Sequence, residues 1–412
     1  MHQKLKKKIN IYLTFDGLSD QLGKSQILPY MESFLIKEND FFIFSLEKKD
    51  NLLKFIKPNF LKNKKVFWEK KNFSNSKNKF VKLIELIKFF LMCFNVCRNK
   101  NVQTIHCRGL QPALIGFLLK YIFKSKMIFD MRGLWVDEKL DMGTLNKKNI
   151  IDKSIYTFLK NIENFILKNT DHLVVLTNKV KEYVVNKKLL KPEKISVIPC
   201  SVDYQIFAKN SELKRKDTFY RYYTIPENSI IMTYCGSLSG YYMLDEMLNF
   251  FEQLSLKKKN VFFLLITADL KVIENKLKNK DYENKDYKNN IIFLKADWNE
   301  VPFYLSLSKF MISFIKPTFA KIASSPTKIA EAMALGVPVV SNSGIGDLDE
   351  LIENNNLGAI IDLNSNKIDQ FIEHNMQKIL TLSKQTIIND SFNLFDIKKS
   401  KANYKKIYEK LT

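Results

Sequence analysis

The chain is poor in cysteine and histidine, and its cysteines do not form pairs. Its 412 residues include 5 cysteines and 4 histidines. The cysteines show neither the pattern of a disulfide framework nor the spacing of a zinc site; they are Cys93, Cys97, Cys107, Cys200 and Cys235. We therefore expect reduced, buried thiols in a cytoplasmic protein. We expect no secretory signal, because the first residues lead directly into a strand-like run at 9–13.

Arginine is also scarce, although the chain is strongly basic. Five arginines occur among 66 basic residues, and the net charge is +23. A charge of this size is typical of proteins that bind nucleic acid, anionic lipid or phosphate-rich ligands. The lysines are scattered, and no recognised nucleic-acid-binding motif is present. The sequence therefore favours a membrane surface or a phosphate-rich partner and predicts no nucleic acid.

Long uninterrupted apolar runs are missing as well. The most hydrophobic stretch, residues 80–97, contains Lys82, Glu85 and Lys88 and is too polar to span a membrane. Two interpretations stay open for it, a buried amphipathic helix of the core and a helix lying at a membrane surface.

What is present is an alternation of short apolar strands with helical segments. Strands are predicted at 9–14, 40–46, 104–107, 126–130, 172–176, 231–235, 261–267, 291–294, 311–315, 337–341 and 358–361. Helices are predicted between them in the first half at 26–37, 80–98, 112–123 and 153–169. This pattern and the length predict an α/β fold with two doubly wound parallel sheets. Ligands bind at the carboxyl ends of strands in such sheets.

One segment, residues 324–341, predicts a loop, a helix and a buried strand. Ser325 suits the helix cap, Pro326 its first position and Gly336 its end. A helix N-terminus of this kind binds phosphate through backbone N–H groups and the helix dipole. Glu331, one turn further on, can hold a sugar diol. The segment therefore predicts a nucleotide-sugar site, with an ordinary capped helix as the alternative.

Five segments in order resemble bacterial members of glycosyltransferase family 4, nearly over the full length. They are DGLSDQLGKSQ at 16–26, HCRG at 106–109, FDMRGLWVDE at 129–138, GSL at 236–238, and residues 324–336. The resemblance implies a GT-B fold, with two Rossmann-like domains facing across a cleft. An acceptor-binding domain would span 1–200 and a nucleotide-sugar-binding domain 201–391. A helix at 392–412 would cross back to the first domain.

The resemblance also implies a reaction and a set of site residues. A sugar would pass with retention from a nucleoside-diphosphate sugar to a glycan or lipid-linked glycan acceptor, without a required metal or other cofactor. Glu331 would bind the ribose hydroxyls. The implied donor-binding residues are Gly236, Ser237, Ser324, Ser325, Pro326, Thr327, Ala296 and Asp297. The implied acceptor-binding residues are Gly17, Gly23, Arg108, Asp137 and Glu138.

The chain departs from the family pattern where the donor would bind. Ala323 replaces a second glutamate, and Ser237 and Tyr242 replace a basic pair. A departing diphosphate needs positive charge nearby, so we predict this role for Lys328, with a solvated surface lysine as the alternative. Arg132 is predicted to stabilise the leaving group, because its guanidinium suits phosphate.

The predicted catalytic set is thus Arg132, Lys328 and Glu331. Arg108 would contact acceptor or phosphate, and Asp137 and Glu138 would orient the acceptor or, alternatively, close their loop by an ion pair. The predicted protein is a cytoplasmic hexosyl- or N-acetylhexosaminyltransferase of surface polysaccharide synthesis, in contact with the inner face of an anionic membrane if the acceptor is lipid-linked. A non-catalytic glycan-binding or scaffold protein and a sugar-nucleotide epimerase are the alternatives. Ala323 and the few histidines argue against the epimerase.

Overall fold

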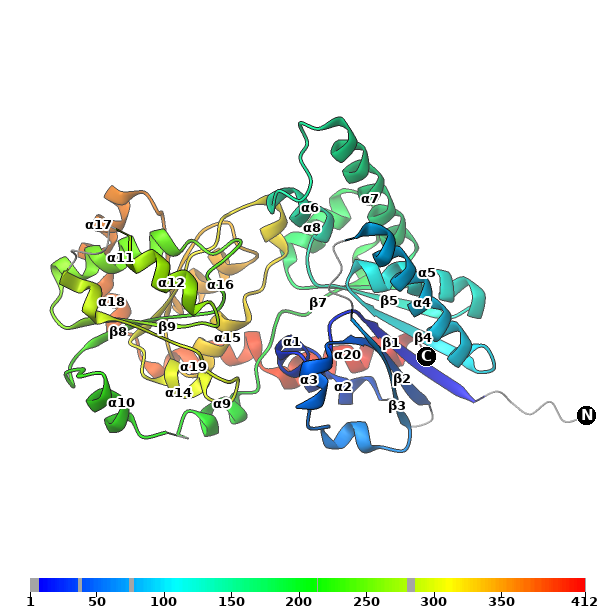
Figure 1. The fold of residues 1–412 in the computed structure, drawn as a ribbon, viewed down its shortest axis with the longest axis horizontal. Coiled ribbons are helices and arrows are strands. Elements are labelled where there is room, and N and C mark those ends of the chain that lie inside the picture. Colours follow the sequence, from blue (N-terminus) through cyan, green and yellow to red (C-terminus); the bar gives the residue numbers. More distant parts are fainter. Residues whose placement is uncertain (1–6, 36–38, 74–77, 213, 280–285, 412) are drawn as a thin grey trace, which may run out of the picture. The chain divides into compact units, whose positions relative to one another are not determined.

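The computed structural model describes residues 7–35, 39–73, 78–212, 214–279 and 286–411. Contacts divide the chain into two compact units (Figure 1). Unit 1 is Met1–Pro199 with Lys398–Thr412, and unit 2 is Cys200–Ile397. The return of the chain to unit 1 therefore begins at 398, later than the expected 392, because the helix that covers residues 384–395 packs in unit 2.

Unit 1 is built on a seven-stranded parallel sheet in the order β3-β2-β1-β4-β5-β6-β7. Its strands are β1 (Lys8–Thr14), β2 (Asp40–Glu47), β3 (Val66–Asn72), β4 (Asn101–Arg108), β5 (Lys126–Met131), β6 (His172–Val175) and β7 (Ile195–Val197). Its helices are α1 (Gln21–Gln26), α2 (Leu28–Met31), η1 (Glu32–Phe34), α3 (Lys49–Leu53), η2 (Asn59–Lys62), α4 (Lys79–Cys97), α5 (Leu110–Phe123), α6 (Trp135–Asp141), α7 (Ile150–Asn169), α8 (Asn178–Asn186), η3 (Pro192–Lys194) and, from the chain end, α20 (Ile397–Leu411).

Unit 2 is built on a six-stranded parallel sheet in the order β10-β9-β8-β11-β12-β13. Its strands are β8 (Ile230–Cys235), β9 (Val261–Ile266), β10 (Ile291–Leu294), β11 (Phe310–Ser313), β12 (Val339–Asn342) and β13 (Gly358–Ile361). Its helices are α9 (Tyr204–Asn210), α10 (Lys216–Tyr222), α11 (Leu244–Lys257), α12 (Leu270–Leu277), η4 (Asp286–Asn290), α14 (Val301–Ser306), η5 (Phe319–Ala323), α15 (Thr327–Ala334), α16 (Leu348–Asn354), α17 (Ser365–His374), α18 (Met376–Leu380) and α19 (Lys384–Phe395). The predicted α/β class with two doubly wound sheets is confirmed.

Burial on both faces explains why the central strands are continuous apolar runs. All six residues of β9 are buried, as are all eight of β2. Successive residues of β8 enter different cores: Ile231 packs in one cluster of unit 2, and Met232 packs in another. Helices cover both sheet faces, as parallel sheets require.

Two local predictions were wrong for physical reasons. The helix predicted at 26–37 begins at Gln21 and breaks at Ile27, because Pro29 has no N–H for a continuous helix and its ring would clash with the preceding turn. The end of the predicted helix, at 36–38, lies outside the described residues. Ser325 does not cap α15, whose N-cap is Pro326; the Ser325 hydroxyl instead accepts from Cys200 N–H at 3.1 Å.

Both units share one strand order, which fixes where a ligand site belongs. Counted from its own first strand, each sheet begins 3-2-1-4-5-6. The order reverses between β1 and β4 in unit 1, and between β8 and β11 in unit 2. Ligands of such sheets bind at this reversal, outside the carboxyl ends of the strands.

Gly23 provides a stability test of the loop at the first reversal. A Cβ at Gly23 would lie 2.1 Å from the Gly17 carbonyl oxygen and 2.7 Å from the Leu18 backbone. We expect Gly23→Ala to lower the free energy of unfolding of unit 1 by about 3 kcal/mol, measured by urea unfolding. Gly143→Ala is the control, since its Cβ meets nothing within 4 Å and only its positive φ costs about 1 kcal/mol. Equal losses in both variants would contradict close packing at Gly23.

Candidate functional site

The loop after β8 is held by a carboxylate that the sequence did not single out. Asp269 follows β9 and accepts from the Ser237 hydroxyl at 2.6 Å and from Leu238 N–H at 2.8 Å. These hydrogen bonds keep the pKa of Asp269 below its ordinary value. Gly236 donates its N–H to Ile266 at the end of β9. The predicted pair Gly236 and Ser237 therefore sits in a rigid turn at the reversal of the sheet.

The two predicted functional side chains of α15 form a close ion pair. Lys328 Nζ lies 2.7 Å from Glu331 Oε2, with the Glu331 side chain 1% exposed and that of Lys328 32% exposed. Burial raises the pKa of Glu331, against the opposite effect of Lys328. Burial also opposes the charge of Lys328, but Glu331 prevails and raises the Lys328 pKa above its ordinary value. Lys328 is therefore a fixed ammonium at neutral pH.

This ion pair lies close to the end of β8. Both of its members interact electrostatically with Cys235, the last residue of the strand, and Lys328 also interacts with Tyr242. Tyr242 is bridged to Ile315, just after β11. The structure thus brings together the end of β8, the segment after β11 and α15, which the sequence had joined only by resemblance.

The segment that joins β11 to α15 carries a second lysine near this place. Lys321 Nζ stands 3.6 Å above the Tyr241 ring, and its carbonyl accepts from Ser324 N–H at 3.0 Å. Ser324 and Thr327 are half-buried at the start of α15. Sequence analysis missed Lys321 because it comes from η5, far from the Gly236 turn in the chain.

The loop after β10 contains Ala296 and Asp297, predicted to lie near the base. Asp297 N–H donates to Glu300 at 3.1 Å, and Ala296 packs against the core. The next residue, Trp298, has a buried indole N–H that finds no hydrogen-bond partner among the described residues, and its ring lies 6.0 Å from that of Phe207. A buried unpaired donor is costly, so Trp298 is a further candidate contact of the base.

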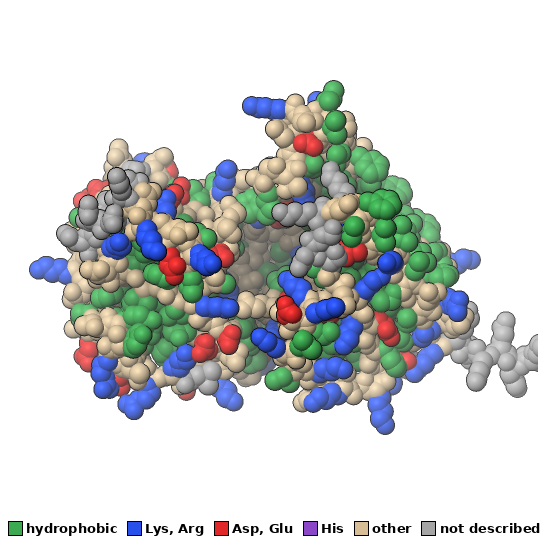
Figure 2. Space-filling model, in the orientation of Figure 1, with side chains coloured by type: hydrophobic (Ala, Val, Ile, Leu, Met, Phe, Trp, Pro, Cys, Tyr) green, Lys and Arg blue, Asp and Glu red, His purple; other side chains and the backbone are tan. Residues whose placement is uncertain are grey.

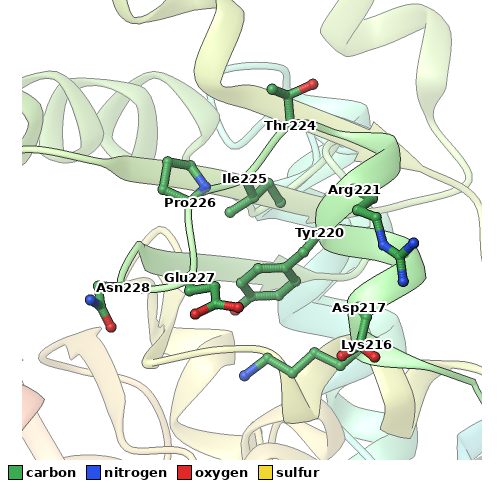
Figure 3. Close-up of a pocket in the computed structure, with 9 residues that line it drawn as sticks. All are labelled: Lys216, Asp217, Tyr220, Arg221, Thr224, Ile225, Pro226, Glu227 and Asn228. Carbon is green, nitrogen blue, oxygen red and sulfur yellow. The ribbon is translucent and has the colours of Figure 1, made fainter.

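Two pockets surround α10 in unit 2. One, of about 960 Å³, is lined by one side of α10 and by residues 224–228, and there Tyr220 and Glu227 point toward one another (Figure 3). The other, of about 450 Å³, is lined by Phe219, Tyr222 and Tyr304 among others. None of the predicted site residues lines either pocket, so these cavities are separate from the loops at the sheet reversal.

In unit 1 a buried carboxylate, Asp130, lies close to two of the five arginines. Arg132 Nη1 lies 3.5 Å from Asp130 Oδ1, and Arg108 Nη1 lies 3.6 Å from Oδ2. Burial opposes the charge of Asp130, but the arginines outweigh it and hold the pKa of this carboxyl well below its ordinary value. Arg108 also pairs with Asp16 at 3.3 Å, so both arginines predicted to meet phosphate or acceptor are ion-paired within unit 1.

The chain end completes this network. Tyr404 of α20 donates to Asp130 Oδ2 at 3.1 Å, and Tyr408 lies 3.0 Å from His106 Nδ1. Burial lowers the pKa of His106, which is therefore neutral near pH 7. The network holds α20 on unit 1 and fixes the ends of β4 and β5.

The glycines of the loop after β1 have a packing role. Glu47, at the end of β2, accepts from Leu18 N–H at 2.7 Å and from Ser19 N–H at 3.1 Å. A Cβ at Gly17 would lie 2.9 Å from the same carboxylate. Gly17 and Gly23 thus let this loop pack closely around Glu47, a residue that sequence analysis missed.

Asp137 is tied to α7. Tyr156 and Lys160 hold its two carboxylate oxygens at 2.8 and 2.6 Å. This matches the loop-closing alternative named for Asp137. Glu138 folds back over Gly133, where a Cβ would lie 3.2 Å from Oε1.

The predicted buried thiols are confirmed: all five cysteines are buried and free. Among the described residues no group of three or more His, Cys, Asp or Glu could hold a metal ion. Over the same residues, none of the helices has the length and apolar character needed to cross a membrane.

Comparison with known proteins bears on the fold and on unit 2. Residues 216–386 match the family model described as Glycosyl transferases group 1. The matched residues lie within unit 2. The chain shares 28% identity over 338 residues with the Escherichia coli UDP-Gal:alpha-D-GlcNAc-diphosphoundecaprenol alpha-1,3-galactosyltransferase, covering 80% of each chain.

A second relative and a solved structure are also similar to this chain. The Staphylococcus aureus capsular polysaccharide biosynthesis glycosyltransferase CapM is 21% identical over 253 residues, 61% of each chain. The structure of Anabaena Alr3699/HepE in complex with UDP and glucose matches with a TM-score of 0.68 at 13% identity, covering 98% of this chain and 99% of that one. The predicted GT-B type of fold is confirmed.

A substitution at Asp130 tests how much the charged network contributes to the stability of unit 1. We expect Asp130→Asn to lower the free energy of unfolding by about 3 kcal/mol, because the buried Arg108 and the partly buried Arg132 lose the carboxylate that they share. Tyr404→Phe, which removes one hydrogen bond, should cost about 1 kcal/mol. Urea unfolding measures both, with the exposed Asp50→Asn as control. If Asp130→Asn behaves like Asp50→Asn, the network does not stabilise the unit.

Proposed function

We propose that this glycosyltransferase moves a hexose, with retention, from a UDP-sugar to a lipid-linked glycan in surface polysaccharide synthesis. The observation that carries the proposal is the Lys328–Glu331 ion pair, with its buried carboxylate, beside the end of β8, at the reversal of the sheet in the unit that matches the family model. The proposal places the donor in unit 2, along Gly236, Ser237 and Ser324 to Thr327. It needs no metal.

The relatives support the choice of donor and acceptor. The E. coli relative is named for UDP-galactose and a sugar diphosphoundecaprenol, and the Anabaena structure contains UDP and glucose. We therefore assign a UDP-hexose as donor, with UDP-galactose first, ahead of an N-acetylhexosamine donor. A polyprenyl-diphosphate-linked sugar is the assigned acceptor, which places the enzyme at the cytoplasmic face of a membrane.

The proposed chemistry depends on charge rather than on a side-chain nucleophile. The sugar leaves the diphosphate while the acceptor hydroxyl attacks the same face, and a diphosphate oxygen takes the hydroxyl proton. Negative charge develops on the leaving diphosphate, and the fixed ammonium of Lys328 stabilises it. Glu331, which accepts from Lys328, binds the ribose hydroxyls. For Arg132, which pairs with Asp130 in unit 1, the role at the leaving group stays a prediction.

A non-catalytic glycan-binding protein is the second candidate. It is favoured by one observation: Asp269 already occupies the Ser237 hydroxyl and Leu238 N–H. Calorimetric titration with UDP, GDP and CMP separates the two candidates, because a degenerate donor site should bind none of them.

Glu331 tests the site itself. We expect Glu331→Gln to weaken UDP binding about 10- to 100-fold in calorimetry, because a charged hydrogen bond to the ribose is lost. Glu353→Gln, an exposed change on α16, is the matched control and should leave the affinity unchanged.

The ion pair requires a second variant. Since Glu331→Gln leaves the Lys328 ammonium without its carboxylate, Lys328→Met with Glu331→Gln removes both charges and guards against unfolding. Both variants should retain the helical circular dichroism of the wild type. Folded variants that bind UDP as tightly as the wild type would overturn the site.

Proton NMR of the product gives the anomeric configuration, and an inverted product would overturn retention.

A further inference from the structure

Three neighbouring helices of unit 1 present large apolar side chains to solvent. On α4 these are Phe80, Leu83, Ile87 and Leu91, which follow one another at spacings of three and four residues. Residues at such spacings share one face of a helix. The opposite face of α4 carries Phe89, Cys93 and Cys97, which are fully buried. This helix is therefore apolar on both faces, and only the inner face is covered in the structure.

The same pattern recurs on α5 and α7. Exposed apolar residues lie at Leu118, Tyr121 and Ile122 of α5, and at Ile150, Ile151, Phe158 and Phe165 of α7. The exposed fractions are large, 68% for Phe80 and 79% for Ile150.

Aromatic contacts join the three helices into one surface. The rings of Phe94 and Phe123 lie 6.0 Å apart and link α4 to α5. The rings of Phe117 and Phe165 lie 5.1 Å apart and link α5 to α7. Hydrophobic side chains gather over the region of these helices in the space-filling view (Figure 2). We call this surface the α4-α5-α7 face. A contiguous exposed apolar face of this extent marks an interaction site.

We propose that the α4-α5-α7 face docks on the surface of an anionic lipid bilayer. Lysines outnumber carboxylates on each of the three helices. Exposed basic residues stand on them or at their ends, namely Lys88, Arg98, Lys124 and Lys168. An apolar face with basic residues beside it matches the acyl boundary and the anionic headgroups of a bilayer.

Charge favours the bilayer over a second copy of the chain. With a net charge of +23, two copies repel one another, whereas anionic lipid attracts the same lysines. The inference rests on the proposed function in one respect: a polyprenyl-linked acceptor lies in a membrane, so an enzyme held at the surface meets it there. The docking itself requires no acceptor and can be measured without one.

Vesicle co-sedimentation tests the face directly. We expect the full chain to bind vesicles of equal parts phosphatidylglycerol and phosphatidylcholine, and to bind phosphatidylcholine vesicles much more weakly. Ile87→Gln with Leu91→Gln should weaken binding about tenfold or more, since two apolar side chains no longer enter the acyl boundary. Leu53→Gln with Ile56→Gln is the matched control, because it changes two exposed apolar residues of unit 1 away from this face.

A variant that removes two positive charges measures the electrostatic contribution to vesicle binding. Lys88→Gln with Arg98→Gln should weaken binding to the anionic vesicles by about fivefold per charge. Lys259→Gln with Lys278→Gln, two exposed lysines of unit 2, should have a much smaller effect.

Several results would overturn the docking surface. These are no binding to anionic vesicles, equal loss in the Ile87/Leu91 and Leu53/Ile56 variants, or a dimer in sedimentation velocity that the Ile87/Leu91 variant dissociates. The last result would assign the face to a second copy. UDP titration of the same samples keeps the two proposals apart. Lost vesicle binding with normal UDP affinity rejects the docking surface alone, and vesicle binding without UDP affinity rejects the proposed donor site alone.

Discussion

Each unit depends on one carboxylate that holds the backbone of the loop following its first strand. Glu47, at the end of β2, accepts the amides of Leu18 and Ser19, and Asp269, just after β9, accepts the amide of Leu238 and the hydroxyl of Ser237. In both sheets the carboxylate comes from the strand beside the first one, on the side away from the reversal. A loop at a parallel-sheet reversal has backbone N–H groups that the sheet does not use, and unpaired buried amides are costly. An internal carboxylate satisfies them and fixes the loop before any ligand arrives.

The distribution of cations follows from the same need to pair buried charge. Two of the five arginines, Arg108 and Arg132, meet at Asp130, where planar guanidinium groups can share a buried carboxylate. The lysines stay mostly at the surface. Lys328 is an exception, and it is held by Glu331 on the next turn of α15. The ends of β4 and β5 are thus held by a charged network within unit 1, while unit 2 holds the Lys328 ammonium beside the end of β8.

Much of the fold could be predicted from the sequence. The strands are buried on both faces and read as continuous apolar runs, and the helical segments between them have a different hydrophobic periodicity. The place of Glu331 and Lys328 was also predictable, since a spacing of three residues puts them on one helix face. Glu47, Asp269 and Trp298 could not be found this way. Their roles depend on strands that meet only in the folded sheet, and an acidic residue at a strand end looks the same whether it binds a loop or water. The tyrosines of α20 escaped notice for the same reason, because Tyr404 and Asp130 are 274 residues apart in the chain.

The apolar residues of helix α4 left two interpretations open in the sequence, and the structure divides those residues in a way that bears on both. Its apolar residues suggested either a core helix or a helix at a membrane surface, and hydrophobic periodicity alone does not choose between them. The structure divides these residues between two faces. Phe89, Cys93 and Cys97 are in the core, while Ile87 and Leu91 face solvent. A helix that only served the core would gain nothing from the second set, since exposed large apolar side chains lower solubility. The helices α5 and α7, beside α4, also expose large apolar side chains, so one shared partner is the simplest physical explanation. A partner that accepts both apolar side chains and lysine has the chemistry of an anionic lipid surface.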